Sequence, residues 1–227
     1  MTLKTSIECV LFDLDGTLVD TAPDFVDVVN QLLSKYNKTP IEPALIYMTV
    51  SDGARALVKL AFEIDEKDKR FIEINKQLLE LYERKLDATQ SVLYPGLPEL
   101  LTNLDESKIP WGIVTNKPWK YSEKLLVQMN LFNRCSVLIC PDQVSSPKPN
   151  PEPILVACRK VGCATTKTVY IGDHVRDIEA AKSAEVIAIA AAYGYLQADA
   201  KIEEWQADFI VTDSTKIEEL LGKLNFR

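Results

Sequence analysis

The sequence lacks the features of a secreted, disulfide-bonded protein. It has five cysteines, which is an odd number, and no C-x-x-C pattern. We therefore expect reduced and mostly buried thiols, as in a cytosolic protein. The N-terminal part has no signal-peptide core, because Asp13 and Asp15 interrupt its only apolar run. The expected location is the cytoplasm.

Long apolar runs and basic blocks are absent as well. No apolar run approaches the length of a membrane span, so we expect no contact with a membrane. The 26 lysines and arginines are outnumbered by 33 aspartates and glutamates, which gives a net charge of −7. This balance disfavours a nucleic-acid partner. An anionic substrate would need local positive charge or a metal ion.

The most informative stretch starts with the apolar run from Cys9 to Phe12, which predicts a short buried strand. Asp13 and Asp15 follow, and Gly16 then lets the chain turn. Residues i and i+2 of a strand point the same way, so both carboxylates lean toward one place beyond its end. Open α/β sheets bind ligands at that edge. A bare D-x-D is also common as an acidic turn, so further motifs are needed to distinguish a ligand-binding site from such a turn.

The pattern of the chain changes at about residue 95. Helical periodicity dominates from residue 18 to 94, where Thr21 is the expected N-cap of the first helix and no strand candidate occurs. After residue 95, strands alternate with helices, which predicts a parallel, doubly wound sheet. We expect an α/β fold with a Rossmann-like core, residues 1–17 and 95–227, and an inserted all-helical cap domain, residues 18–94. The expected later strands are 109–114, 137–140, 168–171, 186–191 and 209–211.

Two further stretches could bind a phosphate group. Thr115 and Asn116 follow a predicted strand, where a hydroxyl and free backbone N–H groups can hold phosphate oxygens. An ordinary turn with local hydrogen bonds explains them equally well. Lys148 lies among the prolines of Pro147 to Pro153, and its ammonium can act as a point charge for phosphate. The alternative is a solvated surface lysine, which does not need such a rigid frame.

A second strand end carries acidic residues. Gly172 and Asp173 follow the predicted strand Thr168 to Ile171, as Asp13 follows the first strand. If the two strands are neighbours, Asp13, Asp15 and Asp173 converge on a site that suits Mg²⁺. Asp177 could support this site one helical turn later, or it could simply offset the helix dipole. The only histidine, His174, is either a loop residue or a contact for substrate or water.

Together these motifs, D-x-D-G-T, the strand-end threonine, the lysine loop and G-D-x-x-x-D, resemble the four motifs of the haloacid dehalogenase superfamily. The resemblance covers nearly the whole chain and points to the phosphoglycolate phosphatase-like subgroup. It extends to stretches that are similar to phosphatases of N-acetylmuramic acid 6-phosphate. These stretches are residues 21–25, 53–56, 111–118, 138–142 and 149–157.

The resemblance implies roles for the motif residues. Asp13 would be the nucleophile and Asp15 the general acid and base, with Mg²⁺ held by Asp13, the backbone carbonyl of Asp15, and Asp173. Phosphate would be bound by Thr115, Asn116 and Lys148, with Thr17 and Asp177 in support. The expected partner is a small phosphate monoester, such as N-acetylmuramic acid 6-phosphate or 2-phosphoglycolate. The expected assembly is a monomer or a weak homodimer.

Arg55 lies in the cap turn Ser51 to Arg55, which the resemblance places over the active site. Both candidate substrates carry a carboxylate, and a guanidinium suits a carboxylate better than an ammonium does. Arg55 is therefore a candidate specificity residue, with a helix-surface arginine as the alternative. The sequence departs from the family pattern at two places: Glu185 replaces a usual glycine, and His174 replaces a usual serine, threonine or aspartate.

Other functions remain open at this point. A sugar-phosphate mutase is the nearest alternative within the fold, although Thr17 favours a phosphatase because such mutases usually carry a bulkier aliphatic residue there. A dehalogenase has no use for Asp15. A non-catalytic sugar-phosphate sensor would not need every chemical position to be filled.

Overall fold

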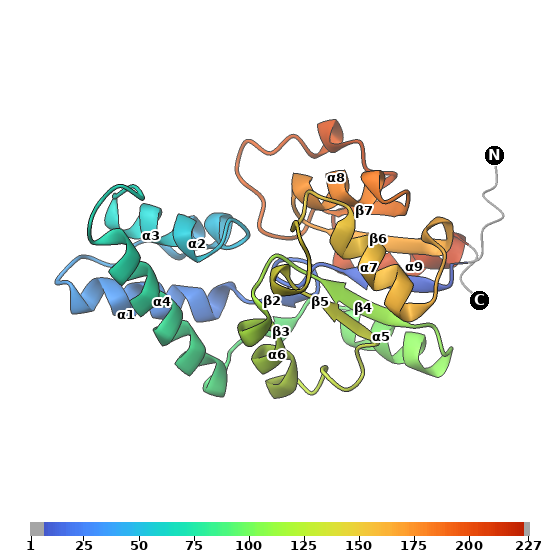
Figure 1. The fold of residues 1–227 in the computed structure, drawn as a ribbon, viewed down its shortest axis with the longest axis horizontal. Helices are drawn as coiled ribbons and strands as arrows, with labels where there is room; N and C mark the ends of the chain where they lie inside the picture. The colour runs from blue at the N-terminus through green and yellow to red at the C-terminus, as the bar shows by residue number, and fades with distance from the viewer. Residues whose placement is uncertain (1–6, 225–227) are drawn as a thin grey trace.

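Six parallel strands form the central sheet, in the order β5-β4-β1-β6-β7-β8. The computed structural model describes residues 7–224, so the parts of the predicted core at 1–6 and 225–227 lie outside the described residues (Figure 1). The strands are β1 (Cys9–Phe12), β4 (Trp111–Val114), β5 (Val137–Ile139), β6 (Thr168–Gly172), β7 (Ile187–Ala191) and β8 (Phe209–Val211). The predicted α/β fold with a doubly wound parallel sheet is confirmed.

The strands are short apolar runs because helices cover both faces of the sheet. Val10 and Phe12 of β1 face one core cluster, and Cys9 and Leu11 face the other, as the alternation of strand side chains requires. The Cys9 face is covered by α7 (Glu152–Val161) and α8 (Val175–Ser183). The opposite face is covered by α5 (Leu97–Glu106), α6 (Trp119–Gln128) and α9 (Ile217–Lys223).

The strand order reverses at β1. The chain forms β4 and β5 on one side of β1 and then crosses to form β6 on the other side. Ligands bind at such a switch point, outside the carboxyl ends of the strands. Asp13 follows β1, Thr115 follows β4 and Asp173 follows β6. The topology therefore brings three of the predicted site positions to one edge of the sheet.

Four helices between β1 and β4 lie together beside the sheet, on the left in Figure 1. They are α1 (Ala22–Lys35), α2 (Pro43–Val50), α3 (Ala54–Phe62) and α4 (Phe71–Lys85). Helices α1 and α4 are joined by a stacked pair, Phe25 and Tyr82, whose ring centres are 4.2 Å apart. Among the described residues, no helix has both the length and the apolar character that crossing a bilayer requires.

The prediction that residues 18–94 contain no strand is wrong. Two short strands, β2 (Val19–Asp20) and β3 (Val92–Leu93), pair in antiparallel orientation where the chain enters and leaves the helical part. A two-residue strand has no periodicity that a sequence could show. The boundaries of the cap at residues 18 and 94 stay a prediction.

Two helix starts also differ from the expectation. The amphipathic pattern from Glu66 to about Leu86 predicts one long helix there, but α4 begins only at Phe71. Asp65 and Asp68 each accept a backbone N–H at 2.8 Å and hold residues 65–70 in turns. Thr21 makes no side-chain cap on α1. Its hydroxyl donates to Asp15 Oδ1 at 2.6 Å instead, so this threonine serves the site rather than the helix.

Candidate active site

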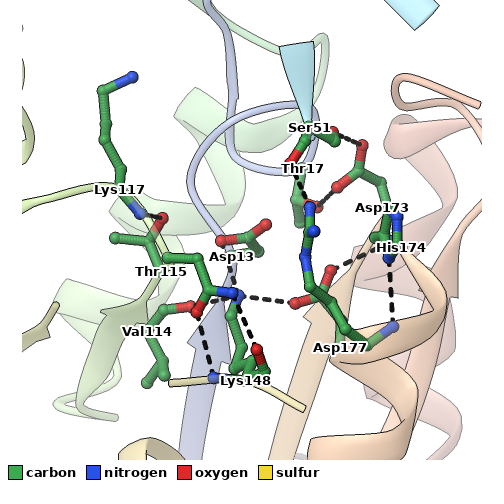
Figure 2. Close-up of polar contacts among 12 residues, drawn as sticks. Asp13, Thr17, Ser51, Val114, Thr115, Lys117, Lys148, Asp173, His174 and Asp177 are labelled. Carbon is green, nitrogen blue, oxygen red and sulfur yellow. Dashed lines mark hydrogen bonds and ion pairs between the residues drawn. The ribbon is translucent and has the colours of Figure 1, made fainter. Parts of the chain in front are cut away.

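The Lys148 ammonium lies at the centre of the site and is fully buried (Figure 2). It is 2.9 Å from Asp13 Oδ1 and 2.6 Å from Asp177 Oδ1. It also donates to the carbonyl of Val114 at 2.9 Å and to the Tyr170 hydroxyl at 2.8 Å. Burial works against its charge, but the two carboxylates outweigh it and raise the pKa of Lys148. The alternative of a solvated surface lysine is excluded.

Three carboxylates lie close together here, and two of them, Asp13 and Asp177, pair with this ammonium. One oxygen each of Asp13, Asp173 and Asp177 lies within 4.8 Å of the others. Burial raises the pKa of Asp13 and of Asp173, and the nearby charge of Asp177 raises both further, while Lys148 opposes the shift at Asp13. One ammonium cannot balance three carboxylates, and the groups present are the oxygen donors that Mg²⁺ prefers. The residues therefore fit a divalent cation.

Asp173 is held by donors from three parts of the chain. Its Oδ2 accepts the backbone N–H of Tyr195 at 2.9 Å and the hydroxyl of Ser51 at 3.1 Å, and its Oδ1 accepts the hydroxyl of Thr17 at 3.3 Å. Gly16, with φ of +81°, packs against this carboxylate so closely that a Cβ would lie 2.2 Å from Asp173 Oδ2. The glycine of the first motif is therefore required both by the turn and by the space that Asp173 occupies.

Asp15 pairs with a different lysine from the one that pairs with Asp13. Its Oδ1 accepts from Lys117 Nζ at 2.8 Å and from the Thr21 hydroxyl. Lys117 is almost buried, with 7% of its side chain exposed. Asp13 thus faces Lys148 and Asp15 faces Lys117, so the two carboxylates of the D-x-D motif sit in different surroundings. Such a difference allows two carboxyl groups to have different roles.

Thr115 and Asn116 also line the cavity above the sheet. The buried Thr115 hydroxyl accepts the N–H of Lys117 at 3.1 Å. The amide of Asn116 clamps the main chain of Lys148, since its Oδ1 accepts the N–H at 3.1 Å and its Nδ2 donates to the carbonyl at 2.9 Å. This side chain holds the lysine loop, which leaves any phosphate contact to other atoms of Asn116.

Asp177 and His174 form the start of α8. Asp177 is fully buried, and its Oδ2 accepts the His174 N–H at 3.1 Å while its Oδ1 takes Lys148. His174 is the N-cap, and its Nδ1 accepts the N–H of Arg176 at 3.2 Å. On the other side of the ring, His174 Nε2 lies 3.5 Å from Oδ1 of Asp52, in the turn between α2 and α3, and lowers the pKa of Asp52. The departure at His174 is thus accommodated by a helix cap.

The departure at Glu185 keeps the geometry that glycine would favour. Glu185 has φ of 57°, in the left-handed region, and its N–H and that of Val186 close the end of α8. The turn after the helix is therefore preserved with a strained glutamate.

The site opens into a cavity of about 410 Å³, whose lining also includes the turn between α2 and α3 and side chains of α4. Arg55 lies in this lining, but its guanidinium pairs with Glu66 and its side chain is 59% exposed. The guanidinium also lies 5.2 Å from the centre of the Phe71 ring. To bind a substrate carboxylate, Arg55 would have to leave Glu66.

Three residues contact the site without being predicted from the sequence: Lys117, Tyr170 and Tyr195. Lys117 lies two residues after Thr115, a spacing that could have flagged it. Tyr170 lies in the middle of β6, and its hydroxyl is within hydrogen-bond distance of the Val114 carbonyl at 2.9 Å and of Asp177 Oδ1 at 3.2 Å. Tyr195 binds Asp173 through its N–H and holds the start of α1 through its hydroxyl. Nothing in the local sequence marks these two tyrosines.

Comparison with known proteins identifies the relatives of this chain. The haloacid dehalogenase-like hydrolase family model matches residues 10–191. An N-acetylmuramic acid 6-phosphate phosphatase of Pseudomonas putida is 36% identical over 215 residues, which cover 95% of this chain and 96% of that protein. A phosphoglycolate phosphatase of Xanthomonas campestris pv. campestris is 41% identical over 202 residues, covering 89% and 90% of the two chains.

A solved structure of a related protein has the same fold as this chain. The crystal structure of a predicted phosphoglycolate phosphatase from Haemophilus somnus superposes with a TM-score of 0.83 at 28% identity, covering 96% of this chain and 99% of that one. The family match spans most of the chain, including all four motifs, and the related proteins are phosphatases. The chain belongs to the haloacid dehalogenase-like hydrolases, and it is an enzyme of the phosphatase type.

Proposed function

We propose that the protein is a Mg²⁺-dependent phosphatase that works through an aspartyl-phosphate on Asp13. The observation that carries this proposal is the pairing of Asp13 with the buried Lys148 at the point where the strand order reverses. Asp15, two residues later, pairs with a different lysine, Lys117. Asp13, the backbone carbonyl of Asp15, and Asp173 would hold the metal ion. When bound, Mg²⁺ would offset the negative charge of the carboxylates and the phosphoryl group.

The residues of the chain perform the following steps in this proposal. An Asp13 oxygen attacks phosphorus, and the bond from phosphorus to the leaving alcohol breaks. Asp15 gives its proton to that alcohol and later takes one from the water that hydrolyses the aspartyl-phosphate. Lys148 and Thr115 bind the remaining phosphoryl oxygens. The cap excludes bulk water and contacts the rest of the substrate.

The proposed substrate is a carboxylate-bearing sugar phosphate, with N-acetylmuramic acid 6-phosphate as the best candidate. Relatives that are named for this substrate match this chain over almost its whole length, at 35–36% identity. The cavity of about 410 Å³ lies in the range of about 300–1,000 Å³ that is usual for small-molecule sites. In this proposal the reaction takes place in the cytoplasm and serves peptidoglycan recycling.

A second candidate substrate is 2-phosphoglycolate, which is favoured by the relative with 41% identity. Phosphate release from both compounds, measured with and without Mg²⁺, tests the proposal. A higher kcat/KM on the sugar phosphate supports it, and a preference for 2-phosphoglycolate selects the second candidate. Release that does not need Mg²⁺ would refute the metal dependence. Binding of sugar phosphate without any release would indicate a sensor, and transfer to a second sugar position would indicate a mutase.

A further inference from the structure

One wall of the cavity carries polar groups that the proposed chemistry does not use. Tyr82 and Asn75 project from α4 into this lining. The Tyr82 side chain is 1% exposed, and no described residue forms a hydrogen bond with its hydroxyl. Asn75 Oδ1 is likewise buried without a partner among residues 7–224. Buried polar atoms are nearly always paired in folded proteins, so two unpaired atoms on one cavity wall need an explanation.

Lys117 adds positive charge to the same wall. Its ammonium lies 4.6 Å from the centre of the Tyr82 ring and 5.1 Å from that of Phe25, which faces the cavity from α1. Figure 2 shows the Lys117 side chain pointing away from Asp13 and Lys148, and only Lys117 of these two lysines lines the cavity. Burial opposes the charge, but the carboxylate of Asp15 outweighs it and raises the pKa of Lys117.

The Tyr82 hydroxyl is a hydrogen-bond donor here. Burial raises the pKa of Tyr82, so the phenol keeps its proton at neutral pH. The wall therefore offers one ammonium, one O–H donor and one amide acceptor, between the apolar surfaces of Phe25 and Leu79. A carboxylate accepts from the first two groups, and an amide N–H satisfies the third.

We propose that Tyr82 and Lys117 bind the carboxylate of the leaving alcohol and that Asn75 accepts an N–H from it. This inference rests on the proposed phosphatase function and narrows its substrate class to anionic alcohols with an amide group. The phosphoryl end lies toward Asp13 and Lys148, and the carboxylate lies toward α4. Tyr82 and Lys117 are better placed than Arg55 for this purpose, since both are almost completely buried in the cavity wall, whereas the Arg55 side chain is 59% exposed.

The alternative is that Tyr82 only packs against Phe25, with its stacked ring at 4.2 Å. Replacement of Tyr82 by phenylalanine separates the two explanations, because it keeps the ring and removes only the hydroxyl. Tyr36→Phe is the matched control, since Tyr36 is a half-exposed cap tyrosine outside the cavity lining. The substrate pair is N-acetylmuramic acid 6-phosphate and N-acetylglucosamine 6-phosphate, which differ only in the carboxylate-bearing lactyl group.

The measured quantity is the ratio of kcat/KM for the two sugar phosphates. Tyr82→Phe should lower this ratio by about 10–150-fold, the range for a lost hydrogen bond to a charged group. Lys117→Met should also lower the ratio, and Lys117→Arg should recover part of it. Tyr36→Phe should leave the ratio unchanged. An unchanged ratio in Tyr82→Phe, or a larger fall in Arg55→Ala than in Tyr82→Phe, would overturn the inference.

A competition experiment keeps this inference separate from the proposed substrate. If the wild-type enzyme cleaves neither sugar phosphate, inhibition of p-nitrophenyl phosphate hydrolysis by N-acetylmuramic acid and by N-acetylglucosamine is compared. Stronger inhibition by the acid that disappears in Tyr82→Phe would support the carboxylate subsite while the proposed substrate fails. Equal inhibition by both sugars, or no effect of Tyr82→Phe, would refute the subsite itself.

Discussion

The pairing of Lys148 with Asp177 gives the sharpest prediction about stability. Asp177→Asn removes one carboxylate from an ammonium that lies 2.6 Å away, with both side chains fully buried. Breaking a buried ion pair typically costs about 3–5 kcal/mol. Lys148 keeps Asp13 at 2.9 Å as a partner, and the loss of the Asp177 charge relieves its repulsion of Asp13 and Asp173. We therefore expect a loss near the lower end, about 3 kcal/mol.

The assay is urea unfolding followed by circular dichroism, with thermal melting as a second measurement. For a chain of this size a loss of about 3 kcal/mol lowers the melting temperature by about 6–12 °C. The control is Asp27→Asn, since Asp27 pairs with Lys85 at the same 2.6 Å but is 50% exposed. That surface pair should contribute less than about 1 kcal/mol.

A double-mutant cycle tests the origin of the effect. Lys148→Met leaves both Asp13 and Asp177 without their ammonium, so it should cost more than Asp177→Asn does. The double variant should be more stable than the sum of the two losses indicates, by about 0.5–3 kcal/mol. If Asp177→Asn costs no more than Asp27→Asn, the buried network does not stabilise the fold and our reading of Lys148 is wrong.

Four further predictions follow from the site. Asp13→Asn should abolish phosphate release and leave the circular dichroism spectrum unchanged, because an amide is a poor nucleophile; substantial release would exclude Asp13 as the nucleophile. The pKa values of Asp13 and Asp173 are raised in the folded protein, so above the ordinary carboxyl pKa the folded state holds more protons than the unfolded state. The free energy of unfolding therefore falls as the pH rises from the ordinary carboxyl pKa to the raised values. In EDTA the melting temperature should therefore drop between about pH 5 and pH 8, and Mg²⁺ should raise it more at the higher pH; a Mg²⁺ effect that does not depend on pH would contradict this. Glu185→Gly should raise stability by about 0.5–1 kcal/mol in urea unfolding, since Glu185 has φ of 57°, and a loss of stability would show that the glutamate is not strained. Arg55→Ala should lower kcat/KM on a carboxylated phosphate ester by less than Tyr82→Phe does, because its guanidinium is exposed and paired with Glu66; a loss of about 10–150-fold with little change on an aryl phosphate would instead assign the substrate carboxylate to Arg55, and equal losses on both esters would indicate a contact with phosphate.

The sequence predicted the parts of this site that depend on strand ends. Asp13 and Asp173 each follow a short apolar strand, and the parallel alternation of strands and helices places such ends at one edge. Lys148 could be singled out because prolines on both sides fix its loop. These inferences use only local patterns and the general rule for parallel sheets.

The missing parts depend on contacts between residues that are far apart in the sequence. The clamp of Asn116 on the Lys148 backbone joins β4 to the proline-rich loop, and nothing near Asn116 signals it. The Tyr82 hydroxyl lies at the cavity only because α4 packs on α1. Thr21 has the sequence pattern of an N-cap, but its hydroxyl donates a hydrogen bond to the nearby carboxylate of Asp15 instead. Tertiary partners thus override local preference.

The ribbon of β2 and β3 has a consequence for how this enzyme could diversify. The chain enters and leaves the four-helix part α1–α4 through two paired strands, as it would enter and leave the tip of a single hairpin. Insertions or deletions among these helices need not move the ends of β1 and β6, which Asp13 and Asp173 follow. We therefore expect that the corresponding helices of a relative could be grafted between Asp20 and Val92. Such an exchange would replace the α4 residues that line the cavity, while Asp13 and Asp173 keep their places at the strand ends.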